Sequence, residues 1–327
     1  MSFTIKEAKE VLAQKFLLEE GITGISHASQ KLIIYVESEE HAEEIPKTLM
    51  GFPVETRVTG KITTLQTLPP AKTGRTLAGI IANRTMRFRP VCGGCSMGSI
   101  KITAGTNATR VIDKTTGQKL FLSNRHIFWG DTKTPITQPA PYDGGTEKDT
   151  VAYVERYVEI KPPPDTNLVD AALGNPIDQA IVSDEILDIG VANGIAEPRV
   201  GMKIQKSGRT CGLSEATIID INATVKVEGY PDINTAIFED TIITTFCGLP
   251  GDSGSLAVSA DTKAAVGLLF AGSETVTCFN KITNVCKLLN IDIPQARITI
   301  TPPTPSIIYA ALPILTGLIM LSMTPLK

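Results

Sequence analysis

The residues Gly251-Asp252-Ser253-Gly254-Ser255 place one serine between two glycines. Gly251 and Gly254 allow backbone conformations that a β-carbon would forbid, so the chain can turn tightly around Ser253. Such a turn points consecutive amides in one direction, and we predict that the N–H groups of Gly251 and Ser253 form an oxyanion hole, braced by Asp252. The alternative is an ordinary turn, since Pro, Gly and Asp are common turn residues.

A serine hydroxyl is a weak nucleophile at neutral pH. It needs a histidine that takes its proton and a carboxylate that orients the imidazole. The chain has three histidines, of which His27 and His41 lie in a charged N-terminal stretch. His126 lies in the apolar segment Leu122–Phe128, which can hold its ring in one orientation. We therefore predict that His126 is the base.

Asp170 is the best candidate for the carboxylate, because it is a single charge among the apolar and small residues of 167–173. A buried carboxylate is costly unless it is hydrogen-bonded, and His126 would provide that bond. Asp165 follows three prolines and Asp178 lies in a polar turn, so both are weaker candidates. The alternative for Asp170 is a capping or strand-end aspartate.

With His126, Asp170 and Ser253 in this order, the chain resembles a trypsin-like serine peptidase of the chymotrypsin fold, in particular the bacterial-type members without a secretion signal. The two other well-known triad lineages run Ser, Asp, His and Asp, His, Ser, so the order favours this fold. The resemblance covers about residues 95–292. It implies a mainly-β domain of two barrels, with base and acid on one barrel and the nucleophile on the next.

The segment Val266–Gly272 resembles the strand that lines the specificity pocket of this family and pairs with the substrate backbone. The family's digestive members select the P1 residue, whose carbonyl is attacked, with a residue six positions before the serine. Here that residue is Cys247, not an acid. A neutral substrate-binding pocket of Cys247, Phe270, Ala271 and Gly272 predicts small or apolar P1 residues. Lys206–Gly212 resembles a Gly-Arg-Thr-x-Gly stretch of the family and is interpreted as a fold marker.

The six cysteines do not require a disulfide framework. Cys247 and Cys278 resemble in placement a disulfide of secreted family members, and this bridge is one hypothesis. Cys92-Gly93-Gly94-Cys95 has metal-ligand spacing, but no second Cys-x-x-Cys or nearby histidine pair completes four ligands. We therefore expect no metal and no cofactor.

The chain is long enough, at 327 residues with 42% hydrophobic content, for two or three units with a sizeable core. A net charge of −3 and a pI near 5.8 argue against a nucleic-acid-binding surface. The charged amphipathic start, Met1–Glu10, lacks an apolar signal region, so we expect a reducing, cytoplasmic location.

Four segments are predicted. They are a small α+β module (1–63), a linker (64–79), the trypsin-like domain (80–295), and a Pro-rich spacer with an apolar tail (296–327). In the module we expect helices over 4–19 and 39–50 and strands over 32–36 and 54–62. The module could pack on the peptidase, gate its cleft or bind a partner. Further strands are predicted over 99–104, 110–112, 217–227 and 264–270.

The tail contains an apolar run over residues 306–323. As a helix, 18 residues would extend roughly 27 Å, close to the hydrocarbon thickness of a bilayer. The tail is predicted either to tether the protein to a membrane or to pack on its own protein or an oligomer partner.

The residues and the resemblance together predict a serine endopeptidase that acts on protein or peptide substrates through an acyl-enzyme. The rival interpretation is a retired peptidase that binds peptides or scaffolds other proteins without turnover, which fold analogy does not exclude. An esterase with the same triad is less well supported, because trypsin-like barrels bind extended peptides.

Overall fold

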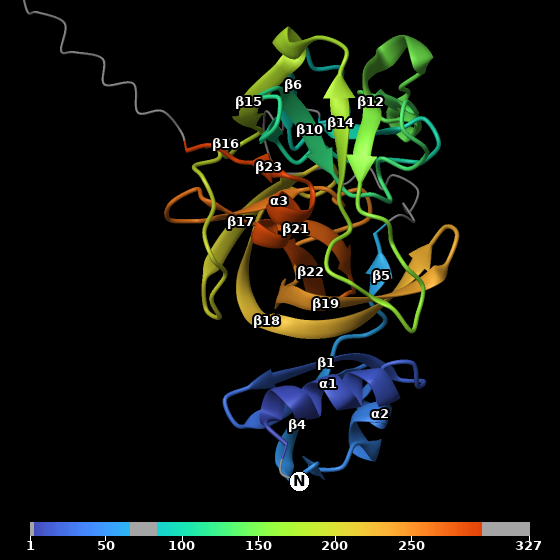
Figure 1. The fold of residues 1–327 in the computed structure, drawn as a ribbon, viewed down its shortest axis with the longest axis vertical. Helices are drawn as coiled ribbons and strands as arrows, with labels where there is room; N and C mark the ends of the chain where they lie inside the picture. The colour runs from blue at the N-terminus through green and yellow to red at the C-terminus, as the bar shows by residue number, and fades with distance from the viewer. Residues whose placement is uncertain (1–2, 66–83, 296–327) are drawn as a thin grey trace, which may run out of the picture. The chain divides into compact units, whose positions relative to one another are not determined.

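The computed structural model describes residues 3–65 and 84–295 of the chain. Most of its regular structure is β-strand (Figure 1). The predicted linker is described only as far as residue 65, and the predicted spacer and tail lie outside the described residues. Within the two described ranges, no helix is both long and apolar enough for a membrane span.

The N-terminal segment folds as a small α+β unit, as predicted. Its elements are α1 (Ile5–Phe16), β1 (Ile22–Ala28), β2 (Lys31–Val36), α2 (Glu39–Glu44), β3 (Thr48–Leu49) and β4 (Phe52–Val58). Thr4 and Glu7 begin α1 with a capping box, in which each side chain accepts a hydrogen bond from the backbone N–H of the other. β2 pairs antiparallel with β1 and parallel with β4, and Leu12 of α1 packs in the core of this sheet.

The second helix is shorter than the predicted range 39–50, so the prediction is wrong for residues 45–50. α2 ends at Glu44 because Ile45 precedes Pro46, and a residue before proline is disfavoured in the α conformation. Ile45 accordingly has an extended backbone with ψ 124°. The chain then enters β3, which pairs with β4.

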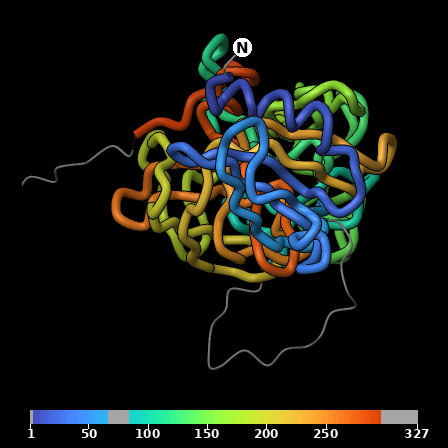
Figure 2. Tube along the Cα trace, turned by 90° about the horizontal axis from the view of Figure 1, so that it is seen from below, coloured from blue at the N-terminus to red at the C-terminus, as the bar shows by residue number. Residues whose placement is uncertain are grey.

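Strand pairing joins the N-terminal unit to the following domain. β1 pairs antiparallel with β18 (Gly212–Tyr230), with Gly24 opposite Val225. The buried carboxylate of Asp220 on β18 accepts hydrogen bonds from Ser26 Oγ at 2.9 Å and Tyr35 Oη at 2.6 Å. In Figure 2 the blue N-terminal elements accordingly lie in front of the domain. The unit therefore extends a sheet of the larger domain.

An eight-stranded sheet forms the first barrel, in the strand order β23-β9-β10-β14-β12-β11-β7-β8. Its strands are β7 (Ser96–Ser99), β8 (Gly105–Thr106), β9 (Arg110–Asp113), β10 (Lys119–Ser123), β11 (Pro135–Thr137), β12 (Thr150–Tyr157), β14 (Ala172–Pro176) and β23 (Ile291–Asp292). A three-stranded sheet contains β6 (Val91–Gly93), β15 (Val182–Ile186) and β16 (Gly190–Val191). The 3₁₀ helices are η1 (Pro141–Asp143), η2 (Glu147–Asp149) and η3 (Gln179–Ile181).

The strand predicted over residues 99–104 is wrong, because β7 ends at Ser99. Ile102 folds back and its N–H donates to the Ser99 carbonyl at 3.2 Å. Its side chain lies over Gly98, where a β-carbon would come within 2.6 Å of Ile102 Cδ1. The glycine therefore permits a turn in which the chain reverses into β8.

Six consecutive strands form the second barrel. They are β17 (Lys203–Gly208), β18, β19 (Asn234–Thr245), β20 (Leu256–Ser259), β21 (Ala265–Gly272) and β22 (Val276–Lys281). They follow the order β19-β22-β21-β20-β17-β18, and a further pairing of β18 with β19 closes the barrel. The short strands β5 (Thr63–Thr64) and β13 (Thr166–Asn167) pair with its strands, and α3 (Ile282–Leu288) follows β22.

One apolar cluster joins the two barrels. Leu120 and Leu122 of β10 are buried in it together with Leu256 of β20, Leu268 of β21 and Ile282 of α3. The predicted mainly-β, two-barrel class with a preceding α+β unit is therefore confirmed. The cluster also holds β10, β14 and β20 near one another, and these strands flank the predicted site residues.

Candidate active site

The structure brings His126 and Asp170 together. His126 lies just after β10 and Asp170 just before β14, and these strands pair antiparallel, with Ser123 opposite Ala172. The Asp170 Oδ2 atom contacts His126 Nδ1, and neither side chain has any exposed surface. A buried carboxylate against Nδ1 holds the imidazole in the tautomer that leaves Nε2 as a proton acceptor.

Further hydrogen bonds fix Asp170 in place. The His126 backbone N–H donates to Oδ1 at 3.2 Å, and the Asp170 N–H donates to Asn280 Oδ1 at 2.9 Å. The third donor is the Tyr230 hydroxyl, 2.9 Å from Oδ2, a residue that the sequence analysis missed. Burial, together with the negative charge of Asp170, holds the pKa of Tyr230 well above its usual value, so the hydroxyl keeps its proton and donates.

We expect the Tyr230→Phe variant to lower kcat/KM about tenfold, because hydrogen bonds to charged groups are worth roughly 1.5–3 kcal/mol. Asp170 would then carry more negative charge toward His126, so the acidic limb of the kcat/KM profile is expected to move to higher pH. Tyr35→Phe is a matched control, since Tyr35 is also buried and donates to an aspartate, Asp220. An unchanged pH profile in Tyr230→Phe would assign Tyr230 a purely structural role.

The loop that carries Ser253 has the sharp turns that its glycines predict. Gly251 and Gly254 both have φ of 94°, and a β-carbon on Gly254 would lie 2.2 Å from the Thr106 carbonyl oxygen. Thr106 of the first barrel donates its N–H to the Ser253 carbonyl at 2.8 Å. Ser253 Oγ is buried, and within residues 3–65 and 84–295 no hydrogen bond joins it to His126.

Asp252 braces this loop through a buried ion pair. Its Oδ2 lies 2.6 Å from Lys206 Nζ, and both side chains are fully buried. Oδ2 also accepts the Leu249 N–H at 3.1 Å, while Oδ1 accepts the N–H groups of Thr210 and Cys211 at 2.8 and 3.1 Å. Burial alone would raise the pKa of Asp252, but the Lys206 charge and these hydrogen bonds lower it below its ordinary value.

The segment Lys206–Gly212, interpreted from the sequence as a fold marker, therefore contributes directly to the geometry around Ser253. The sequence does indicate that the Lys206 side chain is buried. Lys206 alternates with Ile204 on β17 and with Met202 just before that strand, so alternation points this lysine inward.

Of the two predicted oxyanion donors, Gly251 is already engaged. Its N–H donates to the carbonyl oxygen of Leu65 at 2.9 Å. Leu65 follows β5, and β5 pairs antiparallel with the end of β21. The predicted linker thus begins beside the predicted nucleophile.

The predicted substrate-binding residues divide between two apolar clusters. Cys247 lies in one cluster with Leu65 and Leu269. Phe270 lies in another with Ala271, and its ring centroid is 4.7 Å from that of Phe238. Gly272 borders the first cluster, because a β-carbon there would be 3.7 Å from Leu65 Cδ1.

Cys247 and Cys278 are free thiols in the structure, as are the other four cysteines. Burial raises the pKa of Cys247 and raises that of Cys278 to about 12, so both remain protonated at neutral pH. We expect six thiols per chain when the protein is unfolded without reductant and titrated with a thiol reagent. A count of four would mean that one disulfide is present.

The Cys92-x-x-Cys95 pair makes a local contact, in which Cys95 Sγ lies 3.0 Å from the Cys92 carbonyl oxygen. In the part of the chain that the structure describes, no group of three or more His, Cys, Asp or Glu side chains could hold a metal ion.

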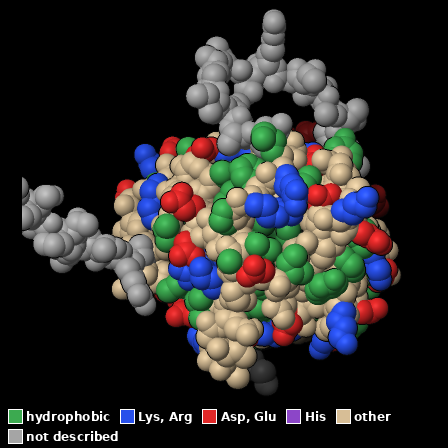
Figure 3. All heavy atoms as spheres, turned by 90° about the horizontal axis from the view of Figure 1, so that it is seen from above, with side chains coloured by type: hydrophobic (Ala, Val, Ile, Leu, Met, Phe, Trp, Pro, Cys, Tyr) green, Lys and Arg blue, Asp and Glu red, His purple; other side chains and the backbone are tan. Residues whose placement is uncertain are grey.

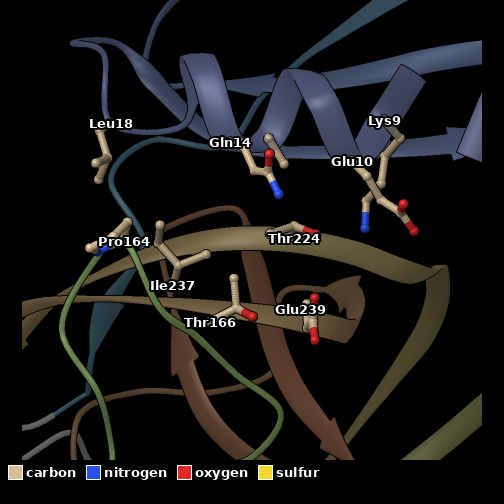
Figure 4. A pocket seen from close by; sticks show the side chains of 10 residues that line it. Lys9, Glu10, Gln14, Leu18, Pro164, Thr166, Thr224, Ile237 and Glu239 are labelled. Atoms are coloured by element: carbon tan, nitrogen blue, oxygen red, sulfur yellow. The ribbon is translucent and has the colours of Figure 1, made fainter. Parts of the chain in front are cut away.

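A separate cavity of about 390 Å³ lies away from these residues (Figure 4). It is lined by α1 residues, including Lys9 and Gln14, and by Thr224 and Ile237 of the second barrel. Figure 3 shows one face of the molecule, on which basic, acidic and apolar side chains are interspersed. The lining of the cavity includes no predicted site residue.

Comparison with known proteins places the chain near bacterial serine proteases. No family model matches the sequence. "Serine protease 2" of Streptomyces fradiae is 36% identical over 80 residues, which are 24% of this chain and 42% of that protein. The chain thus spans less than half the length of this relative, and the match confirms the resemblance to trypsin-like serine proteases.

Solved structures of bacterial proteases align at low identity. The Nocardiopsis protease is 20% identical with a TM-score of 0.49, and the match covers 63% of this chain and 99% of that one. Thermobifida fusca Protease A is 18% identical with a TM-score of 0.48, and the match covers 63% of this chain and 99% of that one.

Proposed function

We propose that the protein is a serine endopeptidase that hydrolyses protein or peptide substrates through His126, Asp170 and Ser253. The observation that carries the proposal is the fully buried contact between Asp170 and His126 Nδ1, which orients the base. The serine loop is braced nearby by Asp252 and Lys206. The sequence similarity to a Streptomyces serine protease supports the same reaction class.

In the proposed mechanism, Ser253 Oγ attacks the carbonyl carbon of the substrate and His126 Nε2 takes its proton. Asp170 stabilises the imidazolium without accepting that proton. The N–H groups of Gly251 and Ser253 hold the oxyanion, an interaction worth on the order of 3 kcal/mol per donor. His126 then gives the proton to the leaving amine, and water releases the acyl group from Ser253.

The proposed substrate preference is a small or apolar P1 residue. Leu65 and Cys247 share an apolar cluster beside β21, and Leu65 is 6% exposed. A charged P1 side chain would be buried here without a partner, which is costly. A substrate strand would pair with the backbone at the end of β21, in the place that β5 occupies in this structure.

A fluorophosphonate probe, which labels activated serines, tests the proposal. Because Leu65 packs in the same cluster as Cys247 of the proposed P1 pocket, labelling is measured on the wild-type protein and on the Leu65→Asp variant. We expect an adduct on the peptide that contains Ser253, and none after Ser253→Ala or His126→Ala. If neither the wild type nor Leu65→Asp is labelled, the peptidase proposal is wrong and peptide binding without turnover becomes the better explanation.

A further inference from the structure

A short piece of the chain's own backbone lies where substrate is expected. Thr63 and Thr64 form β5, which pairs antiparallel with β21, Thr64 opposite Ala271 and Thr63 opposite Gly272. This is the end of the strand predicted to pair with substrate. β5 therefore has the backbone arrangement of a bound peptide.

The next residue presents its carbonyl to the oxyanion donor. The Leu65 carbonyl oxygen accepts the Gly251 N–H at 2.9 Å. Gly251 is two positions before Ser253, so this bond brings the Leu65 carbonyl to the loop that carries the nucleophile. In a peptidase of this kind, the residue in that position is P1, and Thr63 is then P3.

Two apolar side chains anchor the segment. Leu65 Cδ1 lies 3.5 Å from the position that a β-carbon on Gly248 would take and 3.7 Å from that of Gly272, so its side chain lies against both glycines. Ile62 is 1% exposed and packs in the cluster that contains Phe270. The pattern is an apolar P1 and an apolar P4 with the two threonines between them.

Hydrogen bonds to β18 and to the turn after β21 also hold the segment in register. The Glu228 N–H donates to the Ile62 carbonyl at 3.0 Å, and Thr64 Oγ1 donates to the Gly229 carbonyl at 2.9 Å. Thr275 Oγ1 donates to the Thr59 carbonyl at 2.9 Å. The segment is therefore held by hydrogen bonds at Thr59, at Ile62 and from Thr63 to Leu65.

Resting on the proposed function, we propose that the protein's first substrate is its own chain, cut on the carboxyl side of Leu65. Ser253 Oγ attacks the Leu65 carbonyl carbon, and the C–N bond to residue 66 breaks. The Ser253 proton passes through His126 to the leaving amine, which becomes a new N-terminus. Water then hydrolyses the Leu65–Ser253 ester, giving fragments 1–65 and 66–327.

The same contacts define the substrate class for separate peptides. A leucine-sized apolar residue fits P1, and a second apolar residue fits P4, three positions before it. P2 and P3 are expected to be tolerant of small polar residues, as Thr64 and Thr63 are.

Intact-mass analysis of the full-length protein, followed over time after purification, tests the proposal. We expect the wild type to give fragments 1–65 and 66–327, with the new N-terminus at residue 66 by N-terminal sequencing. Ser253→Ala stays whole. Leu65→Asp slows the cut on the order of 100-fold or more, because a charge replaces an apolar P1 side chain, whereas Leu65→Met keeps it within about tenfold.

One control tests whether the position of the substituted leucine matters. Another tests whether each molecule cuts its own chain or that of another molecule. Leu18→Asp changes an exposed leucine of the same unit, 53% exposed, and is expected to be cut like the wild type. The half-time is expected to stay constant over about a tenfold dilution. Added wild-type protein is expected to leave Ser253→Ala largely whole.

Fluorophosphonate labelling distinguishes a failure of the self-cleavage proposal from a failure of the proposed peptidase function. Suppose that the wild type or Leu65→Asp is labelled at Ser253, but the wild type stays whole or is cut elsewhere. Self-cleavage after Leu65 is then overturned, and the proposed peptidase function stands. Neither labelling nor cutting would overturn both. Equal cutting of Leu65→Asp and wild type would remove Leu65 from the P1 position.

Discussion

We expect the Asp170→Asn protein to lose about four orders of magnitude in kcat/KM for a peptide with leucine at P1. The carboxylate accepts hydrogen bonds from the His126 backbone N–H and the Tyr230 hydroxyl while it contacts His126 Nδ1. An asparagine has only one accepting oxygen. If that oxygen keeps the backbone N–H, the amide NH₂ faces Nδ1 and stabilises the tautomer with its proton on Nε2, which cannot take the Ser253 proton.

Asp165→Asn is the matched control, because Asp165 lies nearby in sequence but is exposed. It is expected to keep wild-type kcat/KM. Circular dichroism at the assay temperature checks that Asp170→Asn remains folded. If Asp170→Asn kept a tenth or more of the wild-type rate, Asp170 would not be the residue that orients His126.

The second large effect concerns Lys206. We expect Lys206→Met to lower the free energy of unfolding by about 3–5 kcal/mol at pH 7, because it leaves the buried Asp252 carboxylate without its cation. Urea denaturation with linear extrapolation measures the loss. Peptidase activity is expected to fall as well, since the same carboxylate holds the N–H groups of Leu249 and Thr210 beside the serine loop.

The pH dependence of this loss has a definite sign. In the wild type the folded-state pKa of Asp252 is lowered, so its stabilising effect is present above its unfolded pKa, near 4, and is lost on acidification. Without Lys206, burial raises that pKa, so the variant loses stability as the pH rises through and above 4. The stability gap between wild type and variant is therefore expected to widen from about pH 4 to pH 7.

Two variants test the cause. Lys203→Met changes an exposed lysine of the same strand and is expected to leave stability nearly unchanged. Adding Asp252→Asn to Lys206→Met removes the unpaired charge and is expected to restore much of the lost stability. A stability gap that does not vary with pH would mean that lost side-chain packing, not the charge, causes the effect.

The sequence predicted the site residues whose chemistry is local. His126 is the one histidine in an apolar segment, and the glycines around Ser253 indicate a tight turn. The order of the three residues predicted the two-barrel class, because it is tied to one known lineage. Whether the three residues act together remains a prediction until activity is measured.

Tyr230 could not be predicted in the same way. Val225 and Val227 of β18 both point into the apolar core that contains Phe238, so strict alternation would place residue 230 on the opposite face of the strand. The pairing with β19 shifts register between Glu228 and Tyr230, and this irregularity turns the side chain inward. Such a shift depends on a partner strand that is distant in sequence.

The hydrogen bond between Leu65 and Gly251 could not be predicted from the sequence either. Residues 64–79 look like a linker because they are rich in Thr, Pro and Gly. Two threonines carry no strong strand signal, and β5 exists only because β21 supplies its hydrogen bonds. The shortened α2 is different, because Pro46 in the sequence is enough to end the helix before Ile45.

The pairing of β1 with β18 has a consequence for competition at the cleft. β1 pairs with β18, and β4, which belongs to the same small sheet, ends at Val58, one residue before Thr59. Residues 59–65 are therefore held near their binding site at a high effective concentration, of the order of millimolar for a short tether. A peptide from solution has to displace this tethered strand, so its apparent affinity is reduced in proportion. Cutting after Leu65 would leave that anchor intact, because it lies on the same side of the cut as the strand it holds.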